Sequence, residues 1–374
     1  MVRPLRFLVA PDKFKGSMDA AAAARAICEG IGNVLPDAVF QVVPLADGGE
    51  GTAEAFVSIG RGVRRPTNVE DALRRPIDSS FVELADGRGA VIEMAAAAGL
   101  VHLRPEERNP LWATTFGVGQ LMSLALQRGA KELWIGLGGS ATNDGGAGLA
   151  AALGWSFHDQ NGEPFFPFPA ELHRLAALTP PTSSPSFRCV ALADVSNPLL
   201  GPNGATAIFG PQKGVTRETA GILENSLTRL ADVASETLGR DHRATSGAGA
   251  AGGTGFGLLT FCNAEIRSGF EVIAELSQIS EAVEWADWII TGEGSLDRQS
   301  ISGKGPVGLA RMGRAAGKMT AAFAGRVETD EALSAEFDAI HVITPPGLPL
   351  RQALSDGPSL LRAAAEEFAK SLTS

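Results

Sequence analysis

The sequence contains few cysteines and no long apolar run. Its 374 residues include only Cys28, Cys189 and Cys262, which lie far apart and form no Cys-x-x-Cys pair. This spacing argues against a disulfide framework and a zinc ribbon, and it predicts reduced thiols and a cytoplasmic location. No apolar run approaches the roughly 20 residues that span a bilayer, and no signal-peptide pattern opens the chain. We therefore expect no membrane association.

An excess of basic residues is also absent. Lys and Arg number 32 against 42 Asp and Glu, which gives a formal net charge of −10. Non-specific nucleic-acid binding needs a basic surface, so we expect no nucleic-acid partner. A nucleotide could still be held by a few placed cations and backbone N–H groups. Apolar residues make up 44% of the chain and charged residues 20%, as in an ordinary soluble globular protein.

Standard signatures of several enzyme classes are missing. No Gly-x-x-x-x-Gly-Lys-Ser/Thr run occurs, which excludes an ordinary P-loop protein. Ser140 does not lie in a Gly-x-Ser-x-Gly frame, so it is a poor candidate for a hydrolase nucleophile. The glycines around Ser140 are not followed by an acid at the spacing of a dinucleotide-binding unit, which disfavours an NAD-linked oxidoreductase. The five histidines are scattered without metal-ligand spacing.

Strand-like and helix-like segments alternate at both ends of the chain. The first part shows strands at 5–10 and 40–45, a helix at 18–29 with Ser17 as its N-cap, and a helix from 53. The last part shows strands at 288–291, 319–324 and 339–344, and helices at 306–316 and 359–372. This pattern predicts a parallel sheet. We expect two α/β domains: an outer Rossmann-like or flavodoxin-like domain (1–61 and 287–374) and an inserted α/β domain (62–286).

The most informative segment is the glycine-rich loop at 138–148, Gly-Gly-Ser-Ala-Thr-Asn-Asp-Gly-Gly-Ala-Gly. A strand-like run precedes it and a helix-like run follows it. Such a turn presents backbone N–H groups at the positive end of the helix dipole, which suits a phosphate. Asp144 adds a candidate metal contact. The alternative is a purely structural turn with a helix N-cap.

Four further polar runs follow strand-like segments, where ligands bind in open α/β sheets. Two of them lie early in the chain and supply Asp12, Lys13, Lys15, Asp47 and Glu50. The other two lie later and supply Asp194, Lys213, Glu293, Asp297 and Arg298. Carboxylates for Mg²⁺, placed cations and glycine-rich turns together favour phosphoryl transfer.

The runs, in this order, resemble the type-1 glycerate kinase family. The matching segments are Ala-Pro-Asp-Lys-Phe-Lys at 10–15, Pro-Leu-Ala-Asp-Gly-Gly-Glu-Gly-Thr at 44–52, Ile-Glu-Met-Ala at 92–95, the glycine-rich loop, Asp-Val-Ser-Asn-Pro-Leu at 194–199, Ile-Phe-Gly-Pro-Gln-Lys-Gly at 208–214, Gly-Ala-Gly-Ala-Ala-Gly-Gly at 247–253 and Thr-Gly-Glu-Gly-Ser-Leu-Asp at 291–297. The likeness covers nearly the whole chain and is poorest after about residue 325, where Thr-Pro-Pro-Gly-Leu-Pro at 344–349 departs from the family pattern.

The resemblance implies phosphorylation of D-glycerate by ATP and Mg²⁺, with 2-phosphoglycerate as the product. It also implies two nested α/β domains with a carboxylate-rich cleft between them. Residue chemistry then suggests roles. Gly138, Gly139, Ser140, Thr142, Asn143 and Lys213 would bind the ATP phosphates.

The acids and the remaining cations would serve Mg²⁺ and the substrate. Asp194, with Glu293 or Asp297, would bind Mg²⁺. Asp47 or Asp12 would take the proton of the attacking hydroxyl. Lys13, Lys15 or Arg298 would hold the glycerate carboxylate, with Glu50 near the substrate.

Other functions remain as alternatives. One is a kinase of another small hydroxy acid. Ile-Gly-Leu-Gly-Gly-Ser-Ala at 135–141 also loosely resembles a run of the GHMP kinases, although the surrounding runs do not follow that family. Another alternative is a non-catalytic ligand sensor on the same scaffold. A sensor could dispense with catalytic acids, whereas all the candidate acids are present here, which favours an enzyme.

Overall fold

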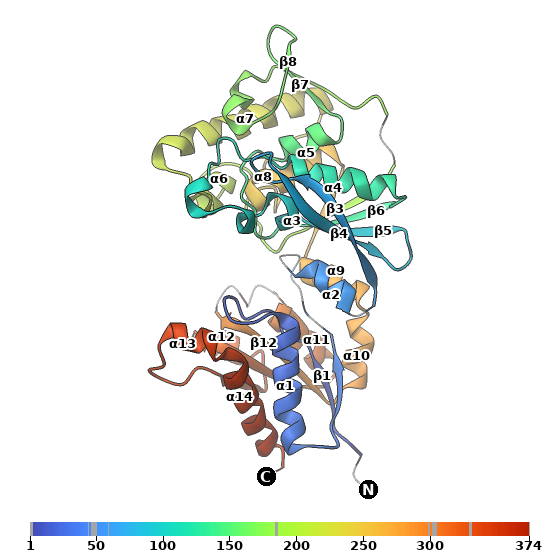
Figure 1. Ribbon diagram of the computed structural model, residues 1–374, viewed down its shortest axis with the longest axis vertical. Helices are drawn as coiled ribbons and strands as arrows, with labels where there is room; N and C mark the ends of the chain where they lie inside the picture. The colour runs from blue at the N-terminus through green and yellow to red at the C-terminus, as the bar shows by residue number, and fades with distance from the viewer. Residues whose placement is uncertain are drawn as a thin grey trace. The chain divides into compact units, whose positions relative to one another are not determined.

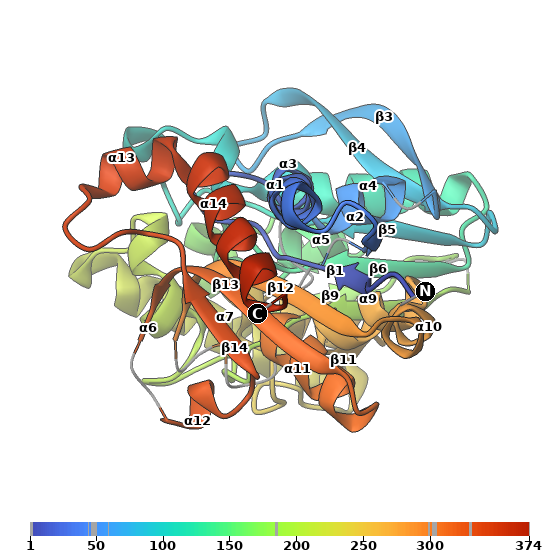
Figure 2. The same ribbon diagram turned by 90° about the horizontal axis from the view of Figure 1, so that it is seen from below.

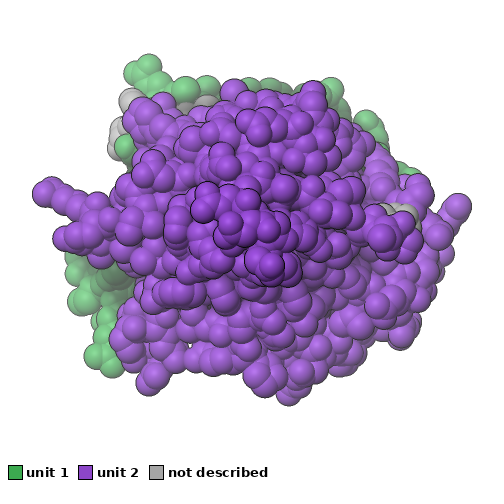
Figure 3. Space-filling model, turned by 90° about the horizontal axis from the view of Figure 1, so that it is seen from above, with its two compact units in different colours: residues 1–47, 270–374 green, residues 48–269 purple. Residues whose placement is uncertain are grey.

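The computed structural model describes residues 3–43, 45, 51–58, 60–183, 186–297, 300, 305–328 and 331–373. The chain divides into two compact units, which Figure 3 shows in different colours: unit 1 (Met1–Asp47 and Phe270–Ser374) and unit 2 (Gly48–Gly269). The predicted α/β fold, with a parallel sheet from both chain ends and a second sheet inserted between them, is confirmed. The domain boundaries expected after residues 61 and 286 stay a prediction.

Unit 1 contains a parallel five-stranded sheet in the order β14-β13-β12-β1-β2. Its strands are β1 (Arg6–Val9), β2 (Val39–Val42), β12 (Trp288–Leu296), β13 (Met319–Val327) and β14 (Ala339–Val342). β1 pairs in parallel with β2 on one side and with β12 on the other. This pairing unites the two ends of the chain in one sheet.

Apolar clusters cover both faces of this sheet, which explains the continuous apolar run in β1. Phe7 packs with Ile27 of α1 and Phe368 of α14, whereas Leu8 packs on the opposite face with Leu309 of α11. Figures 1 and 2 show α1 and α14 side by side. The helices are α1 (Ala20–Val34), α10 (Ile279–Trp285), α11 (Gly305–Ala315), α12 (Glu331–Ser334), α13 (Leu350–Ser355) and α14 (Gly357–Ser371), and α9 (Gly269–Leu276) begins at the unit boundary.

The start of α1 differs from the sequence prediction. Asp19 is the N-cap, and its carboxylate accepts a hydrogen bond from Ala22 N at 2.7 Å. Ser17 instead donates its hydroxyl to Leu354 O at 2.7 Å. The reason is a tight turn, in which Phe14 N donates to Met18 O and delays the helix by two residues. Asp and Ser are equally good N-caps, so local sequence did not decide between them.

Unit 2 contains a mixed six-stranded sheet in the order β11-β10-β6-β5-β4-β3. Its strands are β3 (Gly62–Glu70), β4 (Pro76–Leu84), β5 (Gly89–Glu93), β6 (Glu132–Gly136), β10 (Arg188–Leu192) and β11 (Glu265–Arg267). β5, β6, β10 and β11 are parallel to one another, and β3 and β4 form an antiparallel edge. A second, antiparallel sheet is made of β7 (Ser156–His158), β8 (Pro164–Phe165) and β9 (Ala177–Thr179).

Helices and 3-10 turns connect these strands. The helices are α2 (Thr52–Ser58), α3 (Ala95–Ala98), α4 (Phe116–Gln127), α5 (Ala147–Ala152), α6 (Ala205–Phe209), α7 (Arg217–Leu238) and α8 (Ala250–Phe261). The 3-10 turns are η1 (Leu100–His102), η2 (Pro105–Glu107), η3 (Pro169–Arg174) and η4 (Pro211–Lys213). Among the described helices of both units, none is both long enough and apolar enough to cross a membrane.

Candidate functional site

In unit 2, the carboxyl ends of three parallel strands lie at the same end of the sheet, and the predicted polar runs follow these strands. β5 ends at Glu93, β6 leads into the glycine-rich loop, and Asp194 follows β10. The register places both Glu93 and Leu192 opposite Gly136. Leu137 N also donates to Leu192 O at 3.2 Å. The structure therefore brings the loop and Asp194 to the same end of the sheet, at the carboxyl ends of its parallel strands.

Asp144, where the glycine-rich loop turns into α5, is fully buried. Its carboxylate accepts hydrogen bonds from Thr115 N and Oγ1 at 2.8 Å each, from Gly146 N at 3.0 Å and from Gly148 N at 3.2 Å. Thr115 Oγ1 accepts in turn from Leu149 N at 2.8 Å. Burial raises the pKa of the Asp144 carboxyl, and the Thr115 and glycine donors oppose that rise. Asp144 and the amides at the start of α5 thus bind one another, and the phosphate contact there and the metal contact at Asp144 stay predictions.

The accessible part of the loop lies farther upstream, at residues 138–139, and Ser140 behind them is buried. Gly139 is exposed, and Gly138 is half-buried. Their N–H groups and that of Ser140 donate to no acceptor in the part of the chain that the structure describes. The backbone is fixed from behind, because Leu100 N donates to Gly139 O at 2.9 Å and Ala141 N donates to Ala98 O at 2.8 Å. Three successive amides are thus held in place with no acceptor in the described part of the chain.

Lys213, at the end of η4, lies directly beneath the loop. Its side chain is 1% exposed, and Nζ donates to Ser140 Oγ and to Thr142 O at 2.7 Å each. Burial among these neutral acceptors lowers the pKa of Lys213 to about 7, and the Asp144 charge opposes the fall. The structure brings Lys213 and the loop together, as a phosphate-binding role requires. That role stays a prediction.

Thr142 and Asn143 point into the protein rather than outward, and both are fully buried. Asn143 Nδ2 donates to Thr206 Oγ1 of α6 at 3.0 Å. Thr142 Oγ1 and Asn143 Oδ1 have no hydrogen-bond partner among the described residues. These two side chains belong to a polar layer around Lys213, and they reach no exposed surface directly.

A second glycine-rich segment packs against the loop from α8. Its first turn is left-handed, with φ of +55° at Ala251, +68° at Gly252 and +86° at Gly253. A Cβ on Gly252 would lie 1.9 Å from Thr142 O, and one on Gly257 would lie 2.6 Å from Gly145 O. Only glycine permits this backbone-to-backbone approach. The Gly-Ala-Gly-Ala-Ala-Gly-Gly run is therefore a support for the loop.

Asp194 lies two residues beyond β10 and is half-buried. Its Oδ1 accepts hydrogen bonds from Ser268 Oγ at 2.8 Å and from Gly269 N at 3.1 Å. This carboxylate therefore fixes the start of α9. Asp194 also lies at the same end of the sheet as the glycine-rich loop.

In unit 1, the ends of β1 and β12 also lie together. Asp12 N donates to Gly292 O at 2.8 Å, and a Cβ on Gly294 would lie 3.2 Å from Lys15 N. Asp12 Oδ1 accepts from Lys13 N at 2.6 Å. Asp12 and Lys13 are half-buried, and Lys15 is exposed. The polar run after β1 and the polar run after β12 are thus neighbours at the carboxyl ends of these two strands.

Glu293 and Asp297 are linked through Ser300, which is nearly fully buried. Ser300 Oγ donates to Glu293 Oε1 at 2.8 Å and accepts from Asp297 N at 3.3 Å. The segment that carries Glu293 and Asp297 therefore follows the strand end beside the Lys13 and Lys15 run.

Three predicted residues, Asp47, Glu50 and Arg298, lie outside the described residues. Within the described ranges, no group of three or more His, Cys, Asp or Glu side chains is arranged to hold a metal ion. A site with one or two protein carboxylates, which is usual for Mg²⁺ with nucleotides, does not need such a group.

The sequence reasoning missed two residues near the loop. Glu93 Oε1 accepts from Gly51 N at 2.9 Å and from Ala53 N at 2.8 Å, so it caps α2. The sequence feature that could have identified Glu93 is an acidic residue at the end of an apolar strand. Arg108 Nη1 donates to Gln212 O at 3.2 Å. No sequence pattern identifies that second cation beside the Lys213 segment.

Comparisons with known proteins agree with one another. The model of the family described as "Glycerate kinase family" matches residues 7–373. The chain is 41% identical over 374 residues to "Glycerate kinase" of Bacillus subtilis (strain 168), with 98% of each chain covered. It is 40% identical over 329 residues to "Glycerate 2-kinase" of Escherichia coli (strain K12), with 87% of this chain and 86% of that one covered. The structure resembles the crystal structure of putative glycerate kinase 2 from Salmonella typhimurium LT2, with a TM-score of 0.87, 36% identity, and 99% and 98% of the two chains covered.

Proposed function

We propose that this chain, which belongs to the glycerate kinase family and is therefore a phosphotransferase, transfers the terminal phosphoryl group of ATP to D-glycerate and releases 2-phosphoglycerate. The relative named glycerate 2-kinase supports the choice of hydroxyl. The structural observation that carries the proposal is the pairing of Lys213 with a loop whose amides at 138–140 donate to no acceptor among the described residues. The free cysteines are consistent with a cytoplasmic enzyme that uses ATP.

The phosphates of ATP are assigned to unit 2. Backbone N–H groups of Gly138, Gly139 and Ser140 would donate to phosphate oxygens, and Lys213 would supply a positive charge beneath them. Thr142 and Asn143 would act through the polar layer that holds Lys213, since their side chains are buried.

The carboxylates fit a Mg²⁺ ion. Asp194, Glu293 and Asp297 offer the hard oxygen ligands that this ion prefers, and nucleotide phosphates complete such sites. When bound, the ion would neutralise charge on the phosphates during transfer.

The substrate is assigned to the basic run of unit 1. Lys13, Lys15 or Arg298 would hold the glycerate carboxylate, with Glu50 beside the substrate, and Asp12 or Asp47 would accept the hydroxyl proton. The proposal requires residues of both units to act on one ATP and one glycerate. Exclusion of water from the reacting groups would prevent wasteful hydrolysis of ATP.

Replacing Lys15 by alanine is expected to raise KM for glycerate about tenfold, because an ion pair with the substrate carboxylate is lost, and to change kcat much less. Steady-state kinetics at saturating ATP check this. Lys131→Ala, at another exposed lysine, is the control and should leave KM unchanged. Equal KM values for the Lys15 variant and the unmodified enzyme would remove Lys15 from the site.

The product identifies the reaction directly. Purified protein incubated with ATP, Mg²⁺ and D-glycerate is expected to give 2-phosphoglycerate, detected by ³¹P NMR. Formation of 3-phosphoglycerate would contradict the assigned hydroxyl and keep the reaction class. If folded protein bound ATP but made no phosphoglycerate, another hydroxy-acid acceptor or a sensor role would replace the proposal.

A further inference from the structure

We infer that Asp144 is a positioning residue for nucleotide binding: by binding the amides at the start of α5, it fixes the glycine-rich loop in a form that leaves the amides at 138–140 to bind a phosphate. The inference rests on the proposed function and specifies how its phosphate site is built. Asp144 itself does not touch the ligand.

The hydrogen bonds of Asp144 join two segments that are distant in the sequence. On one side are Thr115, immediately before α4, and Thr114 Oγ1, which donates to Asp144 Oδ2 at 3.3 Å. On the other side are Gly146 and Gly148, at the start of α5. A fully buried carboxylate with this many donors has one stable orientation, so it fixes the position of both segments.

The glycines after Asp144 serve this carboxylate. Gly146 has φ of +75°, which favours glycine, and its N–H donates to Asp144 Oδ1. A Cβ on Gly148 would lie 1.9 Å from Thr114 Oγ1 and 3.0 Å from Asp144 Oδ2. The Asp-Gly-Gly-Ala-Gly part of the loop is therefore an internal clamp, which we call the Asp144 clamp (residues 144–148 with Thr114 and Thr115).

The Asp144 clamp also acts on Lys213, the cation beneath the loop. Asp144 is the carboxylate whose charge opposes the desolvation of Lys213. Lys213 in turn holds Ser140 Oγ and Thr142 O, which lie upstream in the same loop. The loop is thus fixed at its end by Asp144 and in its middle by Lys213, which leaves Gly138 and Gly139 as its more exposed residues.

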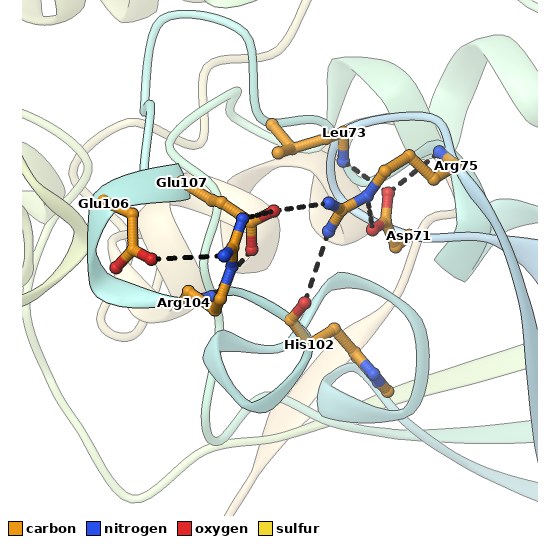
Figure 4. A network of polar contacts seen from close by, with 7 residues as sticks. All are labelled: Asp71, Leu73, Arg75, His102, Arg104, Glu106 and Glu107. Atoms are coloured by element: carbon orange, nitrogen blue, oxygen red, sulfur yellow. Dashed lines mark hydrogen bonds and ion pairs between the residues drawn. The ribbon is translucent and has the colours of Figure 1, made fainter.

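Asp71 provides a matched control, because it is a second buried carboxylate of unit 2 that organises a turn. It is 1% exposed and accepts from Leu73 N at 2.8 Å, Arg75 N at 2.9 Å and Arg75 Nε at 2.6 Å. Figure 4 shows that Arg75 also donates a hydrogen bond to Glu107, which accepts another from Arg104. The Arg104 and Arg75 guanidinium groups lower the pKa of Glu107 to about 2, so this network stays charged at assay pH.

The test compares Asp144→Asn with Asp71→Asn. Both substitutions keep the side-chain shape, put an NH₂ group against backbone donors, and should lower Tm. Only Asp144→Asn is expected to raise KM for ATP, by about tenfold or more, with KM for glycerate within about twofold. If the two variants lost similar Tm and both kept the normal KM for ATP, Asp144 would be a purely structural residue and the inference would fail.

Thr115 supplies a second test if Asp144→Asn does not fold. Thr115→Val removes the hydroxyl that donates to Asp144 and accepts from Leu149 N, whereas Thr115→Ser keeps it. The valine variant should bind a non-hydrolysable ATP analogue more weakly, and the serine variant should restore binding. Equal affinity for both would overturn the inference. Calorimetry of this binding needs no glycerate, so it remains informative even if the phosphoglycerate assay contradicts the proposed function.

Discussion

Replacing Asp194 by asparagine is expected to lower kcat at least about 100-fold while the fold stays intact. Asn can still present an oxygen to Ser268 Oγ and Gly269 N, the two donors that Asp194 now accepts from. The substitution therefore removes the negative charge of residue 194 and preserves the hydrogen bonds that hold the start of α9. If that charge holds Mg²⁺ against the transferring phosphoryl group, kcat falls and a higher Mg²⁺ concentration is needed.

Ser268→Ala is the control for the anchoring role of Asp194. It removes one hydrogen bond to the same carboxylate oxygen and leaves the charge, so kcat should stay within about threefold of the unmodified enzyme. Rates at saturating ATP, glycerate and Mg²⁺, with thermal unfolding of each variant, distinguish the two roles. A kcat for Asp194→Asn no lower than that for Ser268→Ala would assign Asp194 to anchoring alone.

The sequence predicted well which polar runs lie at the carboxyl ends of the strands, because the relevant signals are local. An apolar run followed by glycine and a polar residue is contained in a few residues, and parallel pairing then brings such ends together. The Asp12 run and the Glu293 run meet for this reason, since β1 and β12 pair directly. The same logic places Asp194 beside the glycine-rich loop.

The sequence could not predict which groups occupy the amides at the start of α5. The answer depends on Thr115, which is 29 residues from Asp144 in the chain and reaches it only through the packing of α4. Burial of Thr142 and Asn143 was unpredictable for a similar reason. A polar run typically indicates an exposed loop, whereas here α6 and the left-handed turn of α8 cover it.

Replacing Lys213 by methionine is expected to lower kcat/KM for ATP about 100- to 1,000-fold, the usual cost of removing one charged donor near a transferring phosphoryl group. Methionine fills a similar volume without the charge. The thermal stability provides a second signature. In the folded protein the pKa of Lys213 is about 7, below the ordinary 10.5 of the free side chain. Between these values the unfolded chain binds more protons, so this group adds stability as the pH rises, and the methionine variant lacks that rise.

Nucleotide binding should show the opposite dependence on pH. A bound phosphate favours the charged ammonium, so binding requires uptake of a proton wherever Lys213 is neutral in the free protein. The described charged group that bears on it is Asp144, within the loop. The Kd for an ATP analogue should therefore rise from about pH 7 to about pH 9, a range in which the phosphates themselves are already ionised. Calorimetry in two buffers of different ionisation enthalpy measures the proton uptake directly. Parallel Kd curves for the unmodified enzyme and the Lys213→Met variant would show that Lys213 does not exchange a proton when the nucleotide binds, and its charge would then have to be compensated within the protein.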